Sequence, residues 1–195
     1  MELSEGGPAA AAEPQPRGFA IVRGLPRRHK IAVLGVSLAL TAACFGLFGF
    51  TGRAVVGSVF AAVLTLLTAT DIDRRLIPNV IVLPAIAVLL AAQIALFPDR
   101  TVEWVLAGLF AGLFFFVPLL IFPTGMGMGD VKLAVLLGVV LGKSVGAAIF
   151  AALIAGADFS IAVLLRQGMG ARRKSIPYGP FLAFGGVLVL LLGGR

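Results

Sequence analysis

Two short stretches of this chain carry the residue types needed for acid–base chemistry. The first reads DIDRRLIPN over residues 71–79, and the second reads GMGMGDVK over residues 125–132. Each stretch places an aspartate, Asp71 or Asp130, at the end of an apolar run. Two carboxyl groups that share one proton can hydrolyse a peptide bond, because the ionised one takes a proton from water while the protonated one donates to the carbonyl oxygen.

The first stretch is expected to end a helix. Pro78 cannot continue a helix, so Asp71 should lie in the last turn, where the helix dipole disfavours a negative charge. Asp71 and Asp73 are two positions apart and point to nearly opposite sides, so at most one of them can face the interior. The alternative is that both are solvated charges beside Arg74 and Arg75.

The second stretch is expected to begin a helix. Gly125, Gly127 and Gly129 lack side chains, so neighbouring backbone can approach Asp130 closely. The first turn of a helix favours the ionised form of an aspartate. The alternative is a flexible glycine hinge that Asp130 caps. Lys132 either extends to the lipid headgroups or helps to keep Asp130 ionised.

The composition says what kind of protein must position these residues. The chain has 195 residues, of which 59% are hydrophobic and 13% charged, and its mean hydropathy is +1.07. These values exclude a soluble globule, a coiled coil and a disordered chain. They predict an all-α, polytopic transmembrane helix bundle over residues 31–195, preceded by a disordered basic tail over residues 1–30.

The cysteine count and the net charge indicate which cofactors and partners to expect. The single cysteine, Cys44, excludes an internal disulfide and a multi-cysteine zinc site, and no metal or other cofactor is expected. The net charge of +7 is attributed to loops on the cytoplasmic face and not to a nucleic-acid partner.

Stretches without charged residues define seven expected spans. They are 31–52, 54–70 (extending to 72), 76–98, 104–129, 133–142, 144–157 (extending to 165) and 175–194. If all seven cross with the N-terminus in the cytoplasm, lysine and arginine divide 12 to 4 in favour of the cytoplasm. If 133–142 does not cross, the division is 10 to 6. The positive-inside rule therefore favours seven crossings, with Asp71 and Asp130 both at the cytoplasmic face.

A third stretch, IPYGPF over residues 176–181, completes a resemblance. Together the three stretches resemble the type IV prepilin peptidases, which are membrane aspartic peptidases of the GxGD class. The resemblance implies that Asp71 and Asp130 are the catalytic pair, with Gly127, Gly129 and Lys132 in support. It also implies a multi-pass protein of the bacterial cytoplasmic membrane. Its substrate would be a prepilin or pseudopilin with a basic leader and an apolar helix.

The chain departs from that family in some respects. Longer members carry a cytoplasmic insert with paired CxxC motifs and methylate the new N-terminus; this chain resembles the short form, for which methylation is not expected. Tyr178 replaces the usual phenylalanine. Presenilin-like proteases share the GxGD element, but they have Pro-Ala-Leu near the C-terminus, whereas this chain has YGPFL at residues 178–182.

Two other functions fit the same residues. A proton-coupled transporter could use Asp71, Asp130 and Asp158 as a relay, although no internal repeat is visible and the key acids lie at a face. A non-catalytic scaffold of a secretion machine is the third possibility. We expect Asp158 to be a structural group within its span, and His29 to be a solvated residue of the basic tail.

Overall fold

The computed structural model describes residues 22–121, 127–167 and 177–193, and these residues form a bundle of α-helices without a strand. The prediction of an all-α bundle is thereby confirmed. The helices are α2 (Arg27–Phe48), α3 (Gly52–Arg74), α4 (Asn79–Leu96), α5 (Thr101–Ile121), α6 (Met128–Leu141), α7 (Val145–Gln167) and α8 (Gly179–Leu192), with 3-10 turns η1 (Pro98–Arg100) and η2 (Gly142–Ser144).

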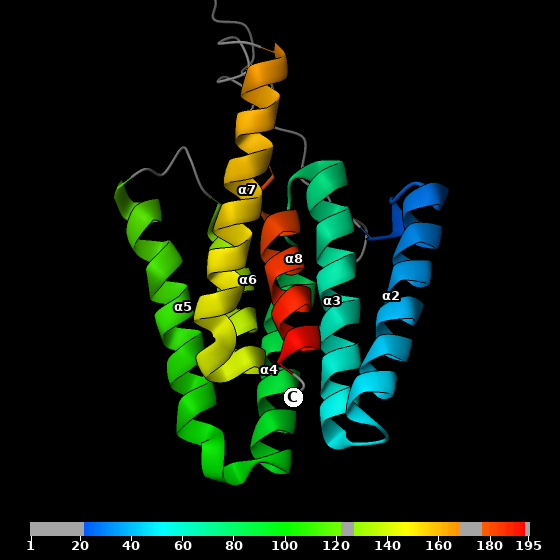
Figure 1. The fold of residues 1–195 in the computed structure, drawn as a ribbon, viewed down its shortest axis with the longest axis vertical. Coiled ribbons are helices and arrows are strands. Elements are labelled where there is room, and N and C mark those ends of the chain that lie inside the picture. Colours follow the sequence, from blue (N-terminus) through cyan, green and yellow to red (C-terminus); the bar gives the residue numbers. More distant parts are fainter. Residues whose placement is uncertain (1–21, 122–126, 168–176, 194–195) are drawn as a thin grey trace, which may run out of the picture.

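Successive helices run in opposite directions along the bundle (Figure 1). The C-terminus of α3 and the N-terminus of α6 therefore lie at one end, which we call the aspartate end. The 3-10 turns η1 and η2 lie at the other, which we call the opposite end (Figure 1). The expectation that Asp71 and Asp130 share one end of the bundle agrees with this arrangement.

Several segments are long and apolar enough to cross a membrane. They are Arg27–Phe48, Gly52–Arg74, Asn79–Leu96, Pro98–Ile121 and Met128–Arg166, the last of which contains both α6 and α7; α8 is a shorter apolar helix. The outward surface is also apolar, since Leu109, Phe110, Leu113 and Phe114 of α5 are exposed. Such a surface is stable against lipid and not against water, so the chain is a multi-pass membrane protein.

Some helix limits differ from the expected spans. The helix expected from Ile31 begins at Arg27, so residues 27–30 are helical, while residues 1–21 of the expected tail lie outside the described part of the chain. The apolar window 104–129 contains the end of α5 and the start of α6. Helix α6 begins at Met128 and is therefore about one turn longer at its N-terminal end than the expected span 133–142. The added turn helps this short helix to run from one end of the bundle to the other.

Helix α6 lies at the centre of the bundle and contacts α3, α4, α5, α7 and α8. Beyond Lys132 its sequence is LAVLLGVVL, which is apolar on every side, and a helix of this kind is stable only when other helices surround it. Leu133, Leu136 and Leu137 are almost fully buried. The helix that carries Asp130 in its first turn is thus held firmly by its neighbours.

Small residues allow α5 and α6 to pack closely. A Cβ atom at Gly138 of α6 would overlap the backbone of Ala107 in α5, and one at Gly112 of α5 would lie 2.6 Å from Val135 Cγ2. Glycine at such positions lets two membrane helices approach backbone to backbone.

Candidate active site

Asp71 lies in the last turn of α3 and is 6% exposed. The helix ends just beyond it because Arg75 adopts the left-handed conformation, with φ 52°, and donates its backbone N–H to the carbonyl oxygen of Asp71 at 2.8 Å. The backbone N–H of Gly179, at the start of α8, donates to Oδ2 of Asp71 at 3.0 Å. The first residue of α8 therefore fixes the orientation of the Asp71 carboxyl group.

Asp130 is the third residue of α6. Its backbone N–H donates to the carbonyl oxygen of Gly127 at 3.0 Å, and the N–H of Gly127 donates back to its Oδ2 at 3.2 Å. This reciprocal pair caps the helix, with Gly127 in the N-cap position and Asp130 at the third helical position and not at the N-cap itself. Gly125, the first glycine of the motif, lies outside the described residues.

The fold brings the two motifs that carry these carboxyl groups into contact at the aspartate end. A Cβ atom at Gly129, next to Asp130, would lie 2.9 Å from Cβ of Ile77 in the first motif. Each group accepts one backbone N–H on Oδ2, which leaves Oδ1 without a protein partner among the described residues. Neither forms an ion pair with a lysine or arginine in the part of the chain that the structure describes. Two acids held in this way can exchange protons with a water molecule and a substrate.

Asp73 points away from this pair. Its carboxylate lies 3.6 Å from Nδ1 of His29 and 3.4 Å from Nε of Arg74. This placement agrees with the expectation that only one of Asp71 and Asp73 faces the site. The description of His29 as a solvated tail residue is wrong, because His29 belongs to α2 and packs beside Asp73.

The role expected for Gly129 changes with the structure. A Cβ atom at this position would lie 2.9 Å from Cβ of Ile77, so the free space beside Gly129 is already filled by the first motif. At Gly127 a Cβ atom would make only an ordinary contact, 3.7 Å from Oδ2 of Asp130. Gly129 thus permits packing between the two motifs, and its space is not open to a substrate.

Lys132 joins the two motifs by a hydrogen bond. Its Nζ donates to Oδ1 of Asn79, the first residue of α4, at 2.7 Å. Neither of the roles expected for Lys132 included this partner. The bond ties the start of α6, and with it Asp130, to the segment that follows Asp71.

Two residues of the third motif belong to the site, and the sequence reasoning did not assign them to it. Gly179 supplies the amide that holds Asp71, and a Cβ atom there would lie 2.5 Å from the carboxyl oxygen. Tyr178 packs against Phe115 and Phe181, with ring centroids 6.1 Å away in each case. Burial, and then the nearby charge of Asp130, raise the pKa of the Tyr178 hydroxyl. Among the described residues that hydroxyl is buried without a hydrogen-bond partner. The IPYGPF motif was the sequence signal that could have identified Tyr178 and Gly179 as site residues.

Other polar residues stand apart from the pair. Asp158 is exposed on α7 and forms no hydrogen bond with a described residue, so it does not act as a buried structural group. Cys44 is fully buried and free, as expected for an ordinary thiol. In the described ranges no three His, Cys, Asp or Glu side chains gather as metal ligands would.

An apolar groove lies beside the aspartate pair. It has a volume of about 400 Å³, runs between α2, α3 and α8, and includes Ile72 and Pro180, the chain neighbours of Asp71 and Gly179. Asp71 and Gly179 themselves are not part of its lining.

The fold and this site define a multi-pass membrane protein with a pair of acids at one end of its helix bundle. Residues 58–165 match the model of the type IV leader peptidase family. The chain is 33% identical to a prepilin leader peptidase/N-methyltransferase of Bacillus subtilis over 85% of its own length and 68% of the relative's. It is 31% identical to a protein of the same name from Pseudomonas aeruginosa, over 76% of its own length and 53% of the relative's.

The chain therefore belongs to the type IV leader peptidase family, and the resemblance drawn from the three motifs is confirmed. The chain spans about two thirds of the first relative and about half of the second. No solved structure matches it significantly. Nothing in these comparisons supports a transporter.

Proposed function

We propose that this protein is an aspartic endopeptidase that removes the leader peptides of type IV prepilins or pilin-like proteins, with Asp71 and Asp130 as its catalytic pair. The observation that supports the proposal is that two motifs in contact each present a carboxyl group held by a backbone amide and unpaired with any described cation. The names of the relatives support the choice of substrate.

The chemistry follows from one shared proton. The ionised carboxylate takes a proton from water as the water oxygen attacks the carbonyl carbon of the scissile bond. The protonated carboxyl group donates its proton to the carbonyl oxygen. Collapse of the tetrahedral intermediate then breaks the carbon–nitrogen bond, with a proton passing to the leaving amine. The backbone amides of Gly127 and Gly179 hold the two side chains in place during these steps.

The site suits a substrate whose basic leader precedes an apolar helix. The apolar segment would approach from the membrane, where the groove that includes Ile72 and Pro180 lies beside Asp71. The leader would remain in water at the aspartate end. We place this end in the cytoplasm of a bacterial cell, with the protein in the cytoplasmic membrane, because of the 12 to 4 division of lysine and arginine.

Cleavage of a co-expressed prepilin from the same genome tests the proposal directly. Asp71→Asn and Asp130→Asn should each lower leader removal by at least about 100-fold, the contribution typical of one general acid or base, while the enzyme remains in the membrane. The matched control is Asp73→Asn, which changes an acid that faces His29 and should retain substantial activity. Full activity in Asp130→Asn would contradict the proposal, and a transporter or scaffold would then become the better interpretation.

The proposed orientation is tested separately by cysteine labelling. In a Cys44→Ser background, a cysteine at the exposed Asp99 should react with a membrane-impermeant reagent from outside the cell, and one at the exposed Arg166 only after lysis. The reverse pattern would place the aspartate end outside the cell. Methylation of the new N-terminus, the second activity in the relatives' name, is not part of the proposal.

A further inference from the structure

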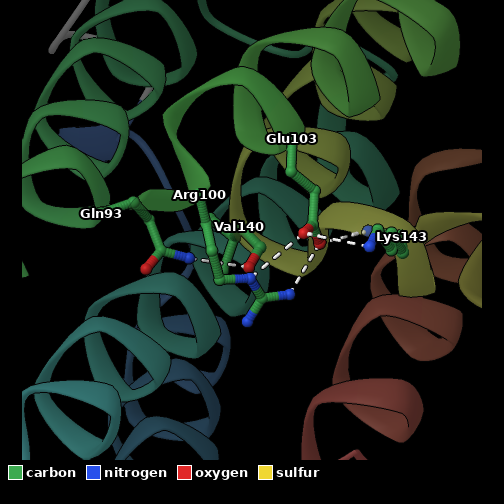
Figure 2. A network of polar contacts seen from close by, with 5 residues as sticks. All are labelled: Gln93, Arg100, Glu103, Val140 and Lys143. Carbon is green, nitrogen blue, oxygen red and sulfur yellow. Dashed lines mark hydrogen bonds and ion pairs between the residues drawn. The ribbon is translucent and has the colours of Figure 1, made fainter. Parts of the chain in front are cut away.

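A second polar cluster, shown in Figure 2, lies around the 3-10 turns η1 and η2 at the opposite end of the bundle from the aspartates. Its centre is Glu103 of α5. The carboxylate accepts bonds from Nε and Nη2 of Arg100 at 3.1 and 2.7 Å and from the backbone N–H of Lys143 at 3.1 Å. Beside it, Gln93 donates to the carbonyl oxygen of Val140 at 2.9 Å (Figure 2). These contacts join α4, α5, α6 and η2.

A cavity of about 180 Å³ lies next to this cluster, with walls from α3, α4, α5, α6 and α8. Arg53 and Arg100 line it, and no carboxylate is found among the described residues of its lining. Glu103, which partly neutralises Arg100, lies outside the lining. The described lining therefore carries two guanidinium groups, of which that of Arg100 is partly neutralised by Glu103.

Both guanidinium groups lie over aromatic rings. Arg53 lies over the ring of Phe97 with its Cζ 5.2 Å from the centroid, and Arg100 lies over Trp104 at 4.6 Å. Stacking fixes the plane of a guanidinium and leaves the N–H groups at its edge available. Arg53 makes no ion pair with any described residue, and the bonds to Glu103 leave Nη1 of Arg100 without a described partner.

The ring of Trp104 and the hydroxyl group of Ser144 belong to the same lining. The indole nitrogen of Trp104 is covered by protein atoms and has no hydrogen-bond partner in the part of the chain that the structure describes, so it is not a donor that a ligand in the cavity can reach. The donors available to a ligand are the edges of the two guanidinium groups and the Ser144 hydroxyl, which suit an acceptor with several oxygens.

We infer that this cavity binds the phosphate group of an anionic phospholipid. Two arginines with free edges match a phosphate, which accepts paired N–H donors. A lipid is favoured over a free ion because Val56, Val189 and Leu190 form apolar walls beside the arginines, and these walls suit the start of an acyl chain. The cavity lies where α3 begins and α4 ends, which is the headgroup level of a bilayer.

Lipid binding by the purified full-length chain in detergent tests this inference. Native mass spectrometry would count phosphatidylglycerol retained by the wild type, by Arg53→Gln and by the matched control Arg166→Gln, which removes an exposed arginine near the end of α7. Arg53→Gln should weaken phosphatidylglycerol binding about tenfold or more, as expected for the loss of a charged hydrogen-bond donor, and Arg166→Gln should leave it unchanged. Phosphatidylcholine should bind more weakly than phosphatidylglycerol to the wild type.

Three results would overturn the inference. Equal phosphatidylglycerol binding by the wild type and Arg53→Gln would show that the cavity is not the site. Equal binding of phosphatidylcholine would show that the anionic charge is not recognised. Displacement of the lipid by millimolar inorganic phosphate would identify a free-anion site. Arg53→Lys controls for folding: it keeps the charge without the planar fork, so its affinity should lie between those of the wild type and Arg53→Gln. None of these results depends on peptidase activity.

Discussion

The aspartate end and the opposite end of the bundle hold their carboxyl groups by different means. Asp71 and Asp130 each accept a backbone N–H and meet no described cation within ion-pair distance. Glu103 is bound by the guanidinium of Arg100 and by the backbone of Lys143, whose ammonium group lies 3.8 Å away. The carboxyl groups at the aspartate end are therefore held by amides alone, whereas Glu103 is held by cations as well.

This difference separates a reactive carboxyl group from a structural one. A backbone amide orients a carboxyl group through one oxygen and adds no full charge, so the second oxygen remains available for a proton. A cation instead stabilises the charged form and opposes protonation. An acid that must both take and give a proton is better served by amides, which is the arrangement at Asp71 and Asp130.

The largest effect is expected where the amide that holds Asp71 is disturbed. In Gly179→Ala the new Cβ atom would lie 2.5 Å from Oδ2 of Asp71, so the carboxyl group must move. We expect leader cleavage, normalised to membrane-inserted enzyme, to fall about 100-fold, as for a misplaced catalytic group. The matched control is Gly146→Ala, where a Cβ atom meets nothing within 4 Å. Equal activity in both variants would show that the Gly179 amide does not position Asp71.

The packing of the two motifs is tested at Gly129. Gly129→Ala should lower cleavage about tenfold, because its Cβ atom would press on Ile77 and displace the start of α6. Adding Ile77→Gly removes Cβ, the atom nearest the new methyl group, together with the γ and δ carbons, and should restore part of the activity. The control is Gly127→Ala, whose Cβ atom makes an ordinary contact and should be tolerated. If Ile77→Gly gives no rescue, Gly129 instead provides room for the substrate.

A smaller effect is expected from the bond between Lys132 and Asn79. Lys132→Met and Asn79→Ala should each lower cleavage about three- to tenfold, since one hydrogen bond contributes roughly 0.5–1.5 kcal/mol. The double variant should be no worse than either single one, because both changes remove the same bond. Additive losses would mean that the two side chains act independently of each other.

The smallest effect on catalysis is expected at the opposite end. Glu103→Gln should lower the melting temperature by a few degrees, because the bonds from Arg100 weaken, and should leave kcat and KM within about twofold of the wild type. Thermal unfolding in detergent and leader cleavage measure the two quantities on one preparation. A loss of cleavage as large as that of Gly179→Ala would remove the distinction between the two ends.

The features that depend on a single segment were predictable from the sequence. The apolar windows located the helices, Pro78 located the end of α3, and the spacing of Asp71 and Asp73 indicated that only one faces the site. The features that join separate segments were not predictable, because a sequence does not state which helices touch. The amide of Gly179 on Asp71 and the contact of Gly129 with Ile77 are of this kind.

His29 is another residue whose contact with a separate segment could not be predicted from the sequence. Its place in a basic, apparently unstructured stretch gave no sign of a partner, and the structure places it on α2 beside Asp73. The expected helix start at Ile31 rested on the loss of charge, but a helix can continue through charged residues once it leaves the apolar layer.

The hydrogen bond from Gly179 to Asp71 spans 108 positions of the chain. A ribosome adds roughly 5–20 residues per second, so a nascent chain carries both aspartates for several seconds before the amide that orients the first of them is made. During that interval the acids are present but the site is incomplete. Under the proposed function, competence to cut would then arrive with α8, after the helices that carry the two aspartates have been made.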